Sequence, residues 1–97
     1  MSSNSLYKSI SNSKKRRLKK QCFEIDCIYQ SYFKNYALTS KFLNTSVTKF
    51  INLVGFEFVE YAINKACDTG LDNLAAIKYF CGICWTEIKK EVENERL

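Results

Sequence analysis

The chain has 97 residues, of which 46% are hydrophobic and 14% aromatic, which supports one domain with an apolar core and excludes a fully disordered chain. It has no proline and only three glycines, a composition that favours long helices over a turn-rich β fold. The formal net charge is +5, yet seven of the fifteen Lys and Arg residues lie in the first twenty positions, without any Asp or Glu. From residue 21 onward, eight basic residues face ten acidic ones, so a basic arm precedes a nearly neutral body.

The sequence predicts a cytoplasmic protein without a membrane partner. No apolar run reaches the roughly 18–20 residues of a membrane span. The N-terminal residues are rich in Ser and Asn and then basic, unlike a signal peptide. The five cysteines are an odd number, which together with this location argues against a disulfide framework.

We predict that the polar residues 1–13 are flexible or weakly helical, with Ser13 as the cap of a first helix over residues 14–36. Apolar residues of that helix recur at intervals of four and three and therefore share one stripe. The stripe consists of Leu18, Cys22, Ile25, Tyr29, Tyr32 and Tyr36. It can bury within one chain or pair two chains as a homodimer. Positive charge in the first turns of this helix opposes the helix dipole, so we expect that end to fray unless an anion or a partner binds it.

Three further helices are predicted, over residues 41–54, 56–68 and 74–93. Their caps are Thr39 or Ser40 for the second helix and Asp72 or Asn73 for the fourth, while the second ends at Gly55. The predicted inward residues are Leu43, Val47, Phe50, Ile51 and Val54, then Phe56, Val59, Ile63 and Ala66, then Leu74, Ile77, Cys81, Cys84, Ile88 and Val92. The expected fold is one all-α domain over residues 14–97, a small bundle of about four helices with short loops.

The composition argues against an enzyme. The chain has no histidine, which is the most usual general base and metal ligand. The three glycines are isolated, and acidic pairs such as Glu57 with Glu60 have the spacing of a solvated helix face. We therefore predict a non-catalytic protein without a cofactor. The alternative is a small enzyme whose nucleophile is Cys81.

The pair Cys81 and Cys84 matches the C-x-x-C motif, and Cys22 with Cys27 would complete a four-thiolate zinc site. The motif lies inside a helical pattern, however, and both of its cysteines fall on the apolar stripe. Because cysteine is a common small core residue, we favour core packing over a metal or redox role and predict no metal site.

The basic run is the strongest functional signal, and it consists of Lys14, Lys15, Arg16, Arg17, Lys19 and Lys20. Such positive charge without acidic neighbours is typical of segments that contact the phosphates of a nucleic acid. The alternatives are an acidic protein surface, a solvated chain end and, least favoured, an anionic membrane, because the charges surround the helix instead of opposing an apolar face.

A second candidate surface lies on the fourth predicted helix. At about 100° per residue, Tyr79, Ile83, Thr86 and Lys90 lie opposite its main apolar stripe. An apolar pair beside a lysine indicates a surface for base stacking or for a partner protein, unless the helix is buried on two sides. We expect Trp85, at the edge of the stripe, to be half-buried.

Several segments of the C-terminal half follow an order that is also found in a known family. They are Val54-Gly55-Phe56-Glu57, Val59-Glu60-Tyr61-Ala62-Ile63, Gly70-Leu71-Asp72-Asn73 and Ile77-Lys78-Tyr79-Phe80-Cys81-Gly82-Ile83. In these segments, residues 42–90 resemble the C-terminal domain of DnaD-like replication initiation proteins of Gram-positive bacteria and their phages. The family pattern continues to a tryptophan at the position of Glu87, whereas this chain has Trp85. The resemblance implies a helical module that binds DNA and supports replication, with Tyr79 and Ile83 on its functional helix.

The leading hypothesis from the sequence is a non-catalytic module that binds nucleic acid, DNA before RNA, with weak sequence specificity, and supports replication of a phage or mobile element. Its predicted contacts are the six residues of the basic run together with Tyr79, Ile83 and Lys90. The rival hypothesis is a small phage or mobile-element protein that binds and inhibits a host macromolecular machine, such as a CRISPR nuclease.

Overall fold

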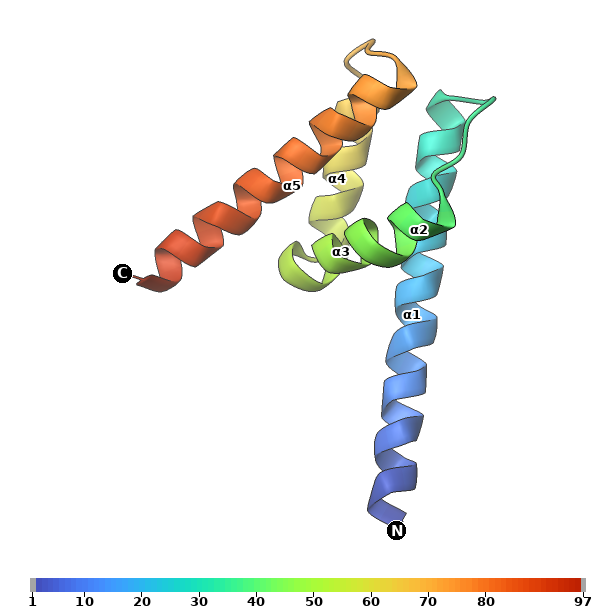
Figure 1. Ribbon diagram of the computed structural model, residues 1–97, viewed down its shortest axis with the longest axis vertical. Helices are drawn as coiled ribbons and strands as arrows, with labels where there is room; N and C mark the ends of the chain where they lie inside the picture. The colour runs from blue at the N-terminus through green and yellow to red at the C-terminus, as the bar shows by residue number, and fades with distance from the viewer. Residues whose placement is uncertain (1, 97) are drawn as a thin grey trace.

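The computed structural model describes the backbone of residues 2–96 and the side chains of residues 15–93. Its elements are α1 (Ser2–Tyr32), α2 (Ser40–Phe42), the π-helical turn η1 (Leu43–Val47), α3 (Thr48–Val54), α4 (Phe56–Cys67) and α5 (Asn73–Arg96). Because α2, η1 and α3 follow one another without a break, they form one helical segment, residues 40–54. Within residues 2–96 there is no strand, so the predicted all-α bundle of about four helices is confirmed (Figure 1).

The long helices α1 and α5 diverge toward the two chain ends. Helix α4 packs against both of them, and segment 40–54 lies across α1 and contacts α4 and α5 through α3 (Figure 1). The radius of gyration is 15.4 Å. A compact domain of this length has about 12.5 Å. The difference arises because the N-terminal part of α1 extends well beyond the body. None of the helices in residues 2–96 is long and apolar enough to cross a membrane.

Both predicted ends of the first helix are wrong. Helix α1 begins at Ser2, so Ser13 lies inside it and is not its cap. The basic run is therefore near the middle of the helix, where the helix dipole has little effect on it. Helix α1 ends at Tyr32, which is 43% exposed, and Tyr36 is 53% exposed, so the last two residues of the predicted stripe lie outside the core. The mobility of residues 1–13 and the homodimer stay predictions, although Cys22, Ile25 and Tyr29 of the stripe are buried within this chain.

The buried carboxylate of Asp26 fixes the connection between α1 and segment 40–54. Its Oδ1 accepts a hydrogen bond of 2.8 Å from the Leu38 backbone N–H, and its Oδ2 accepts one of 2.8 Å from Gln30 Nε2. The carboxylate thus satisfies a backbone N–H that is shielded from water. One residue later, Thr39 Oγ1 accepts a hydrogen bond of 3.1 Å from the Phe42 N–H, which confirms Thr39 as the cap.

The π-helical turn forms where the Leu43 carbonyl accepts from several donors. The Thr48 N–H bonds to this carbonyl, five residues back, and Thr48 Oγ1 donates to it at 2.9 Å. From α1, the Cys22 thiol donates to the same oxygen at 3.5 Å. Side-chain donors that compete for a helix carbonyl disturb the regular ladder, and a π turn accommodates the extra residue. The turn therefore joins segment 40–54 to α1.

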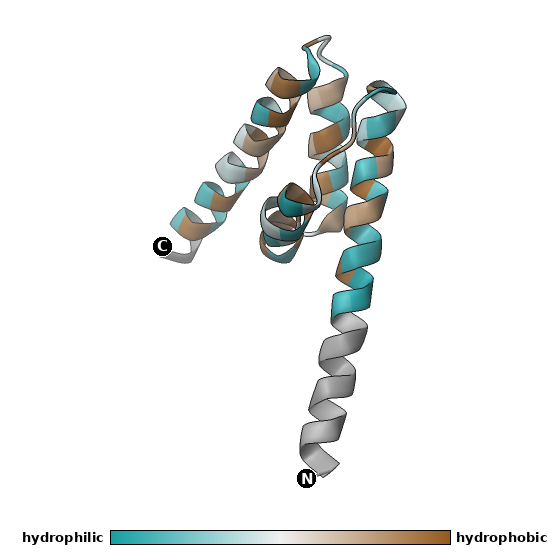
Figure 2. Cartoon of the chain, turned by 45° about the vertical axis from the view of Figure 1, so that its right-hand side comes forward, coloured by the Kyte–Doolittle hydropathy of each residue, from teal (hydrophilic) through white to brown (hydrophobic). Residues whose placement is uncertain are grey.

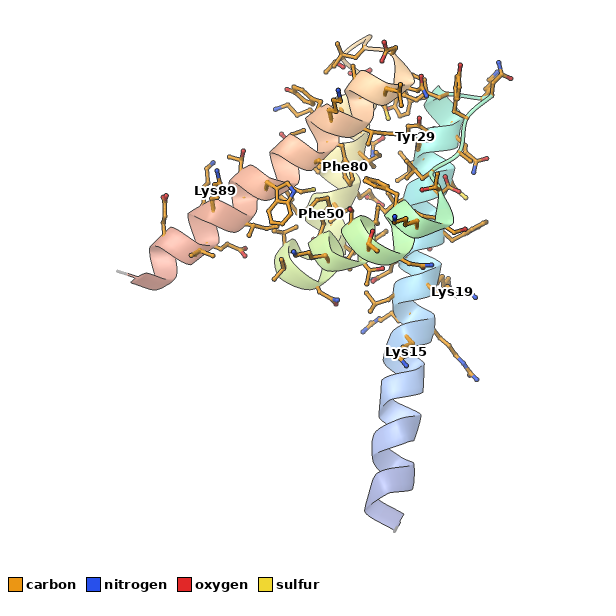
Figure 3. All side chains as sticks on the ribbon, viewed as in Figure 1. Lys15, Lys19, Tyr29, Phe50, Phe80 and Lys89 are labelled. Carbon is orange, nitrogen blue, oxygen red and sulfur yellow. The ribbon has the colours of Figure 1, made fainter. Side chains whose placement is uncertain are left out.

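The core lies where α1, α4, α5 and segment 40–54 meet, and its largest fully buried side chains are Tyr29, Phe50 and Phe80 (Figure 3). The rings of Phe50 and Phe80 meet edge to face with their centroids 5.7 Å apart, a favourable aromatic geometry. The buried hydrophobic residues are Cys22, Ile25, Tyr29, Leu38, Val47, Phe50, Ile51, Val59, Ala62, Ile63, Ala66, Cys67, Ala76, Phe80 and Cys84. The inward residues predicted for the second and third helices are buried, except Leu43, Val54 and Phe56, which are half-buried.

The predicted helix ends at Gly55 and Asp72 are confirmed. Gly55 has φ 89° and ψ 153°, a backbone conformation that residues other than glycine rarely adopt. It separates α3 from α4. At the start of α5, Asp72 Oδ1 accepts a hydrogen bond of 2.8 Å from the Ala75 N–H and caps the helix.

The apolar stripe predicted for the fourth helix is wrong at both ends. In α5, Leu74 is 67% exposed and Val92 is 44% exposed, whereas the buried residues are Ala76, Phe80 and Cys84, four residues apart. The buried face of α5 is therefore rotated from the predicted one. Residues 79–81 are all apolar, and consecutive apolar residues point to different sides of a helix. The spacing of apolar residues therefore did not show which side of α5 packs on α3 and α4.

Candidate nucleic-acid interface

Lys15 and Lys19 of the basic run lie on the part of α1 that extends beyond segment 40–54 (Figure 3), and the described turns of that part are mostly hydrophilic (Figure 2). Five of its cationic side chains are exposed, namely Lys15, Arg16, Arg17, Lys19 and Lys20. The side chain of Lys14, the sixth predicted contact, lies outside the described side chains. The first acidic residue of the chain is Glu24, more than one helical turn beyond Arg17. This part of α1 therefore presents positive charge in several directions.

The fold separates the charges of the chain. Residues 1–54, up to the end of segment 40–54, contain ten Lys and Arg residues and only two acidic ones. One of these two, Asp26, is buried. Residues 55–97, which include α4 and α5, contain five basic and eight acidic residues. Since segment 40–54 packs across α1, one side of the molecule is positively charged and the α4–α5 side is negatively charged.

A pocket of about 340 Å³ lies between α1 and segment 40–54, and it adjoins the basic run. Its lining residues are Lys15, Leu18, Lys19, Cys22, Asn44 and Thr48. Cys22 Sγ lies 3.3 Å from Thr48 Oγ1, so α1 and α3 are in contact where both line the pocket. The lining residues include two lysines and one asparagine, and none of the six is acidic. Asn44 was not among the predicted site residues, because only the packing of η1 on α1 brings it to the same pocket as the lysines.

The predicted surface of the fourth helix forms one wall of a groove between α4 and α5. Tyr79, Ile83 and Lys90 all line this groove, which has a volume of about 530 Å³. The other lining residues are Phe58, Tyr61, Gly82, Thr86 and Glu87. Tyr79 is 41% exposed, so the alternative that this helix is buried on two sides is wrong. On α4, Lys65 Nζ donates a 3.2 Å hydrogen bond to the Tyr61 hydroxyl, which raises the pKa of Lys65.

The structure does not join the two predicted surfaces into one. The basic run is on the extended part of α1, whereas the groove is bounded by α4 and α5 (Figure 3). Trp85 belongs to neither surface. Its ring meets Phe50 edge to face with centroids 5.5 Å apart, and Lys49 Nζ lies 4.9 Å from its centroid. Trp85 is 42% exposed, so the prediction of a half-buried side chain is wrong, although its ring packs on Phe50.

Four of the five cysteines lie in the core or pack against it, whereas Cys27 is exposed. Burial raises the pKa of Cys84 to about 12 and that of Cys67 to about 11, so both thiols are protonated at neutral pH. Cys84 is fully buried, which confirms core packing for that half of the C-x-x-C motif, and Cys81 is half-buried. Among the residues described, no three Cys, Asp or Glu side chains are placed to share a metal ion.

Neither a protein-family model nor a curated protein nor a solved structure matches this chain. The resemblance of residues 42–90 to DnaD-like proteins, and the role in replication that it implies, therefore stay predictions.

Proposed function

We propose that this protein is a non-catalytic nucleic-acid-binding module whose interface is the positively charged side formed by α1 and segment 40–54. The observation that carries the proposal is the separation of charge across the fold. The exposed cations of α1 lie on a helix that extends beyond the body, so a polyanion reaches them without approaching the acidic residues of α4 and α5. This arrangement is the electrostatic pattern of phosphate-binding surfaces.

The binding mode follows from the residue types. Lysine and arginine side chains contact phosphates and position a nucleic acid without reading its bases, so sequence specificity is weak. With five or six phosphate contacts, the logarithm of the binding constant falls with the logarithm of salt concentration with a slope of about −4 to −5. We expect DNA as the natural ligand, and RNA is the other outcome of the test.

A protein-binding role is the second candidate function, and the groove between α4 and α5 favours it. Phe58, Tyr61 and Tyr79 bring three aromatic side chains to one partly open groove, and exposed aromatic clusters are typical of protein interfaces. Glu87 lines the same groove, and the surrounding half of the chain has a negative net charge. Both features disfavour a polyanion there. Under this candidate, the groove binds the host protein that the rival hypothesis requires.

The test of the proposed function is fluorescence anisotropy of labelled single- and double-stranded DNA and RNA at low and moderate salt. Matched variants separate local from global charge effects: Lys19→Ala with Lys20→Ala removes two charges from α1, and Lys78→Ala with Lys89→Ala removes two from α5. All four side chains are exposed, so we expect both variants to keep the thermal stability of the wild-type protein.

We expect the α1 variant to lower affinity by about tenfold or more and to reduce the salt slope by about 2, and the α5 variant to stay within about twofold of wild type. Equal losses in the two variants would mean that net charge alone drives binding, and the interface on α1 would be wrong. Absence of binding to every nucleic acid at low salt would remove the proposal and leave the protein-binding candidate.

A further inference from the structure

One row of exposed side chains on α1 combines cations with an aromatic ring. Lys15, Lys19 and Phe23 follow one another at intervals of four residues and therefore form one ridge along the helix. Phe23 is 63% exposed, whereas Phe33, just after the end of α1, packs on Tyr29 with ring centroids 5.1 Å apart. A single exposed phenylalanine is ordinary on a protein surface. The position of Phe23, one turn beyond a cluster of cations, is what indicates a ligand.

The pocket between α1 and segment 40–54 supplies the other half of the site. Lys15 and Lys19 belong both to the ridge and to the pocket, and Asn44 of η1 lines the same pocket. Two ammonium groups and a carboxamide N–H₂ are suitable donors for the oxygens of one phosphate group. Phe23 lies about 6 Å along the helix axis from Lys19. One nucleotide spans this distance between its phosphate and its base.

We infer that the ridge binds single-stranded nucleic acid, with one backbone phosphate between Lys15, Lys19 and Asn44 and the adjacent base stacked on the ring of Phe23. The inference rests on the proposed function and adds the class of ligand to it. A phenylalanine ring offers no hydrogen bond, so its contribution to nucleic-acid binding is stacking on a base face. A duplex keeps its base faces inside the stack, whereas a single strand exposes them.

The test compares a labelled mixed-sequence single strand with the duplex of the same sequence, by anisotropy at moderate salt. Phe23→Ala removes the stacking ring, and Tyr36→Ala is its matched control, because Tyr36 is 53% exposed and lies beyond the opposite end of α1. Asn44→Ala removes the carboxamide of the pocket, and Asn52→Ala is its control, because Asn52 is an exposed residue of α3 that does not line the pocket.

For the wild-type protein we expect tighter binding of the single strand than of the duplex. Phe23→Ala should lower the single-strand affinity by about tenfold and change the duplex affinity by less than about twofold. Asn44→Ala should lower the affinity for the single strand by about threefold or more, and both control variants should bind as wild type does.

Two results would overturn the inference and leave the proposed function intact. One is a duplex affinity equal to or greater than the single-strand affinity in the wild-type protein. The other is unchanged single-strand binding in Phe23→Ala or in Asn44→Ala, in a protein whose affinity falls by about tenfold or more in the double variant Lys19→Ala with Lys20→Ala. If the wild-type protein binds no nucleic acid at all, the proposed function fails and the inference fails with it.

Discussion

Replacing Asp26 by alanine tests the contact that holds segment 40–54 across α1 and so forms the pocket beside the basic run. Asp26 is 8% exposed, and its two oxygens accept hydrogen bonds of 2.8 Å from the Leu38 N–H and from Gln30 Nε2. Asp26→Ala leaves the Leu38 N–H buried and without its acceptor, which costs about 1–3 kcal/mol. It also removes a charged acceptor whose hydrogen bonds contribute more than neutral ones. We expect a total loss of about 3 kcal/mol in the free energy of unfolding.

Asp26→Asn is the matched variant, because it keeps a carbonyl oxygen for the Leu38 N–H. Its new N–H₂ group faces Gln30, whose side chain is exposed and can turn its own amide oxygen toward it. The expected loss is therefore only about 1 kcal/mol. Urea unfolding followed by circular dichroism measures both values, provided that the slope with denaturant is unchanged. Equal losses in the two variants, or a loss below about 1 kcal/mol in Asp26→Ala, would refute this account of the connection.

Two glycine positions should respond to alanine in opposite directions. At Gly55, where φ is 89°, Gly55→Ala should destabilise the protein by about 1–3 kcal/mol through backbone strain, since an added Cβ meets no atom within 4 Å. Gly82 lies inside α5, also with no atom within 4 Å of an added Cβ, so Gly82→Ala should stabilise by about 0.5–1 kcal/mol. Urea unfolding checks both signs. We expect the protein to become less stable at alkaline pH because of two buried thiols. Burial raises the pKa of Cys67 from 9.0 to about 11 and that of Cys84 from 9.0 to about 12. Above pH 9, these thiols therefore keep their protons in the folded state and lose them in the unfolded state. Stability should then fall as pH rises through this window, by about 1 kcal/mol per pH unit for each thiol, and Cys84→Ala should reduce this slope in unfolding curves measured from pH 8 to 10.5.

The fold was predictable where single residues have unambiguous local preferences. Gly55, Thr39 and Asp72 mark helix ends through backbone conformation or capping, and all three were predicted as helix ends or candidate caps. The end of α1 was not predictable, since the aromatic spacing continues to Tyr36 although the chain turns earlier. The turn depends on the contact between Asp26 and the Leu38 N–H, twelve residues apart, and no local pattern reveals such a contact.

The candidate site was predictable in its charges and not in its geometry. The cations of α1 follow from composition alone, and helical periodicity placed Tyr79, Ile83 and Lys90 on one surface, which the groove between α4 and α5 bears out. Asn44 was missed because its relation to the lysines depends on how a π-helical turn packs on α1. Sequence periodicity gives the face of a helix, and tertiary packing decides what lies opposite that face.

The charge distribution leads to a prediction for Tyr79 that differs from the one based on the sequence. Lys90 is the cation that lines the groove between α4 and α5, and Glu87 lines it too, within a half of the chain where acidic residues outnumber basic ones. A phosphate would meet repulsion there that is absent along α1. We therefore expect Tyr79→Ala to bind nucleic acid within about twofold of wild type and to remain folded, because the side chain is 41% exposed. Anisotropy and a thermal melt of the same sample check this.

A large loss of affinity with an unchanged melting temperature would extend the nucleic-acid interface to α5. A lower melting temperature would mean that Tyr79 contributes to the core. Unchanged binding and unchanged stability together would leave the groove between α4 and α5 available for a protein partner while α1 binds the nucleic acid.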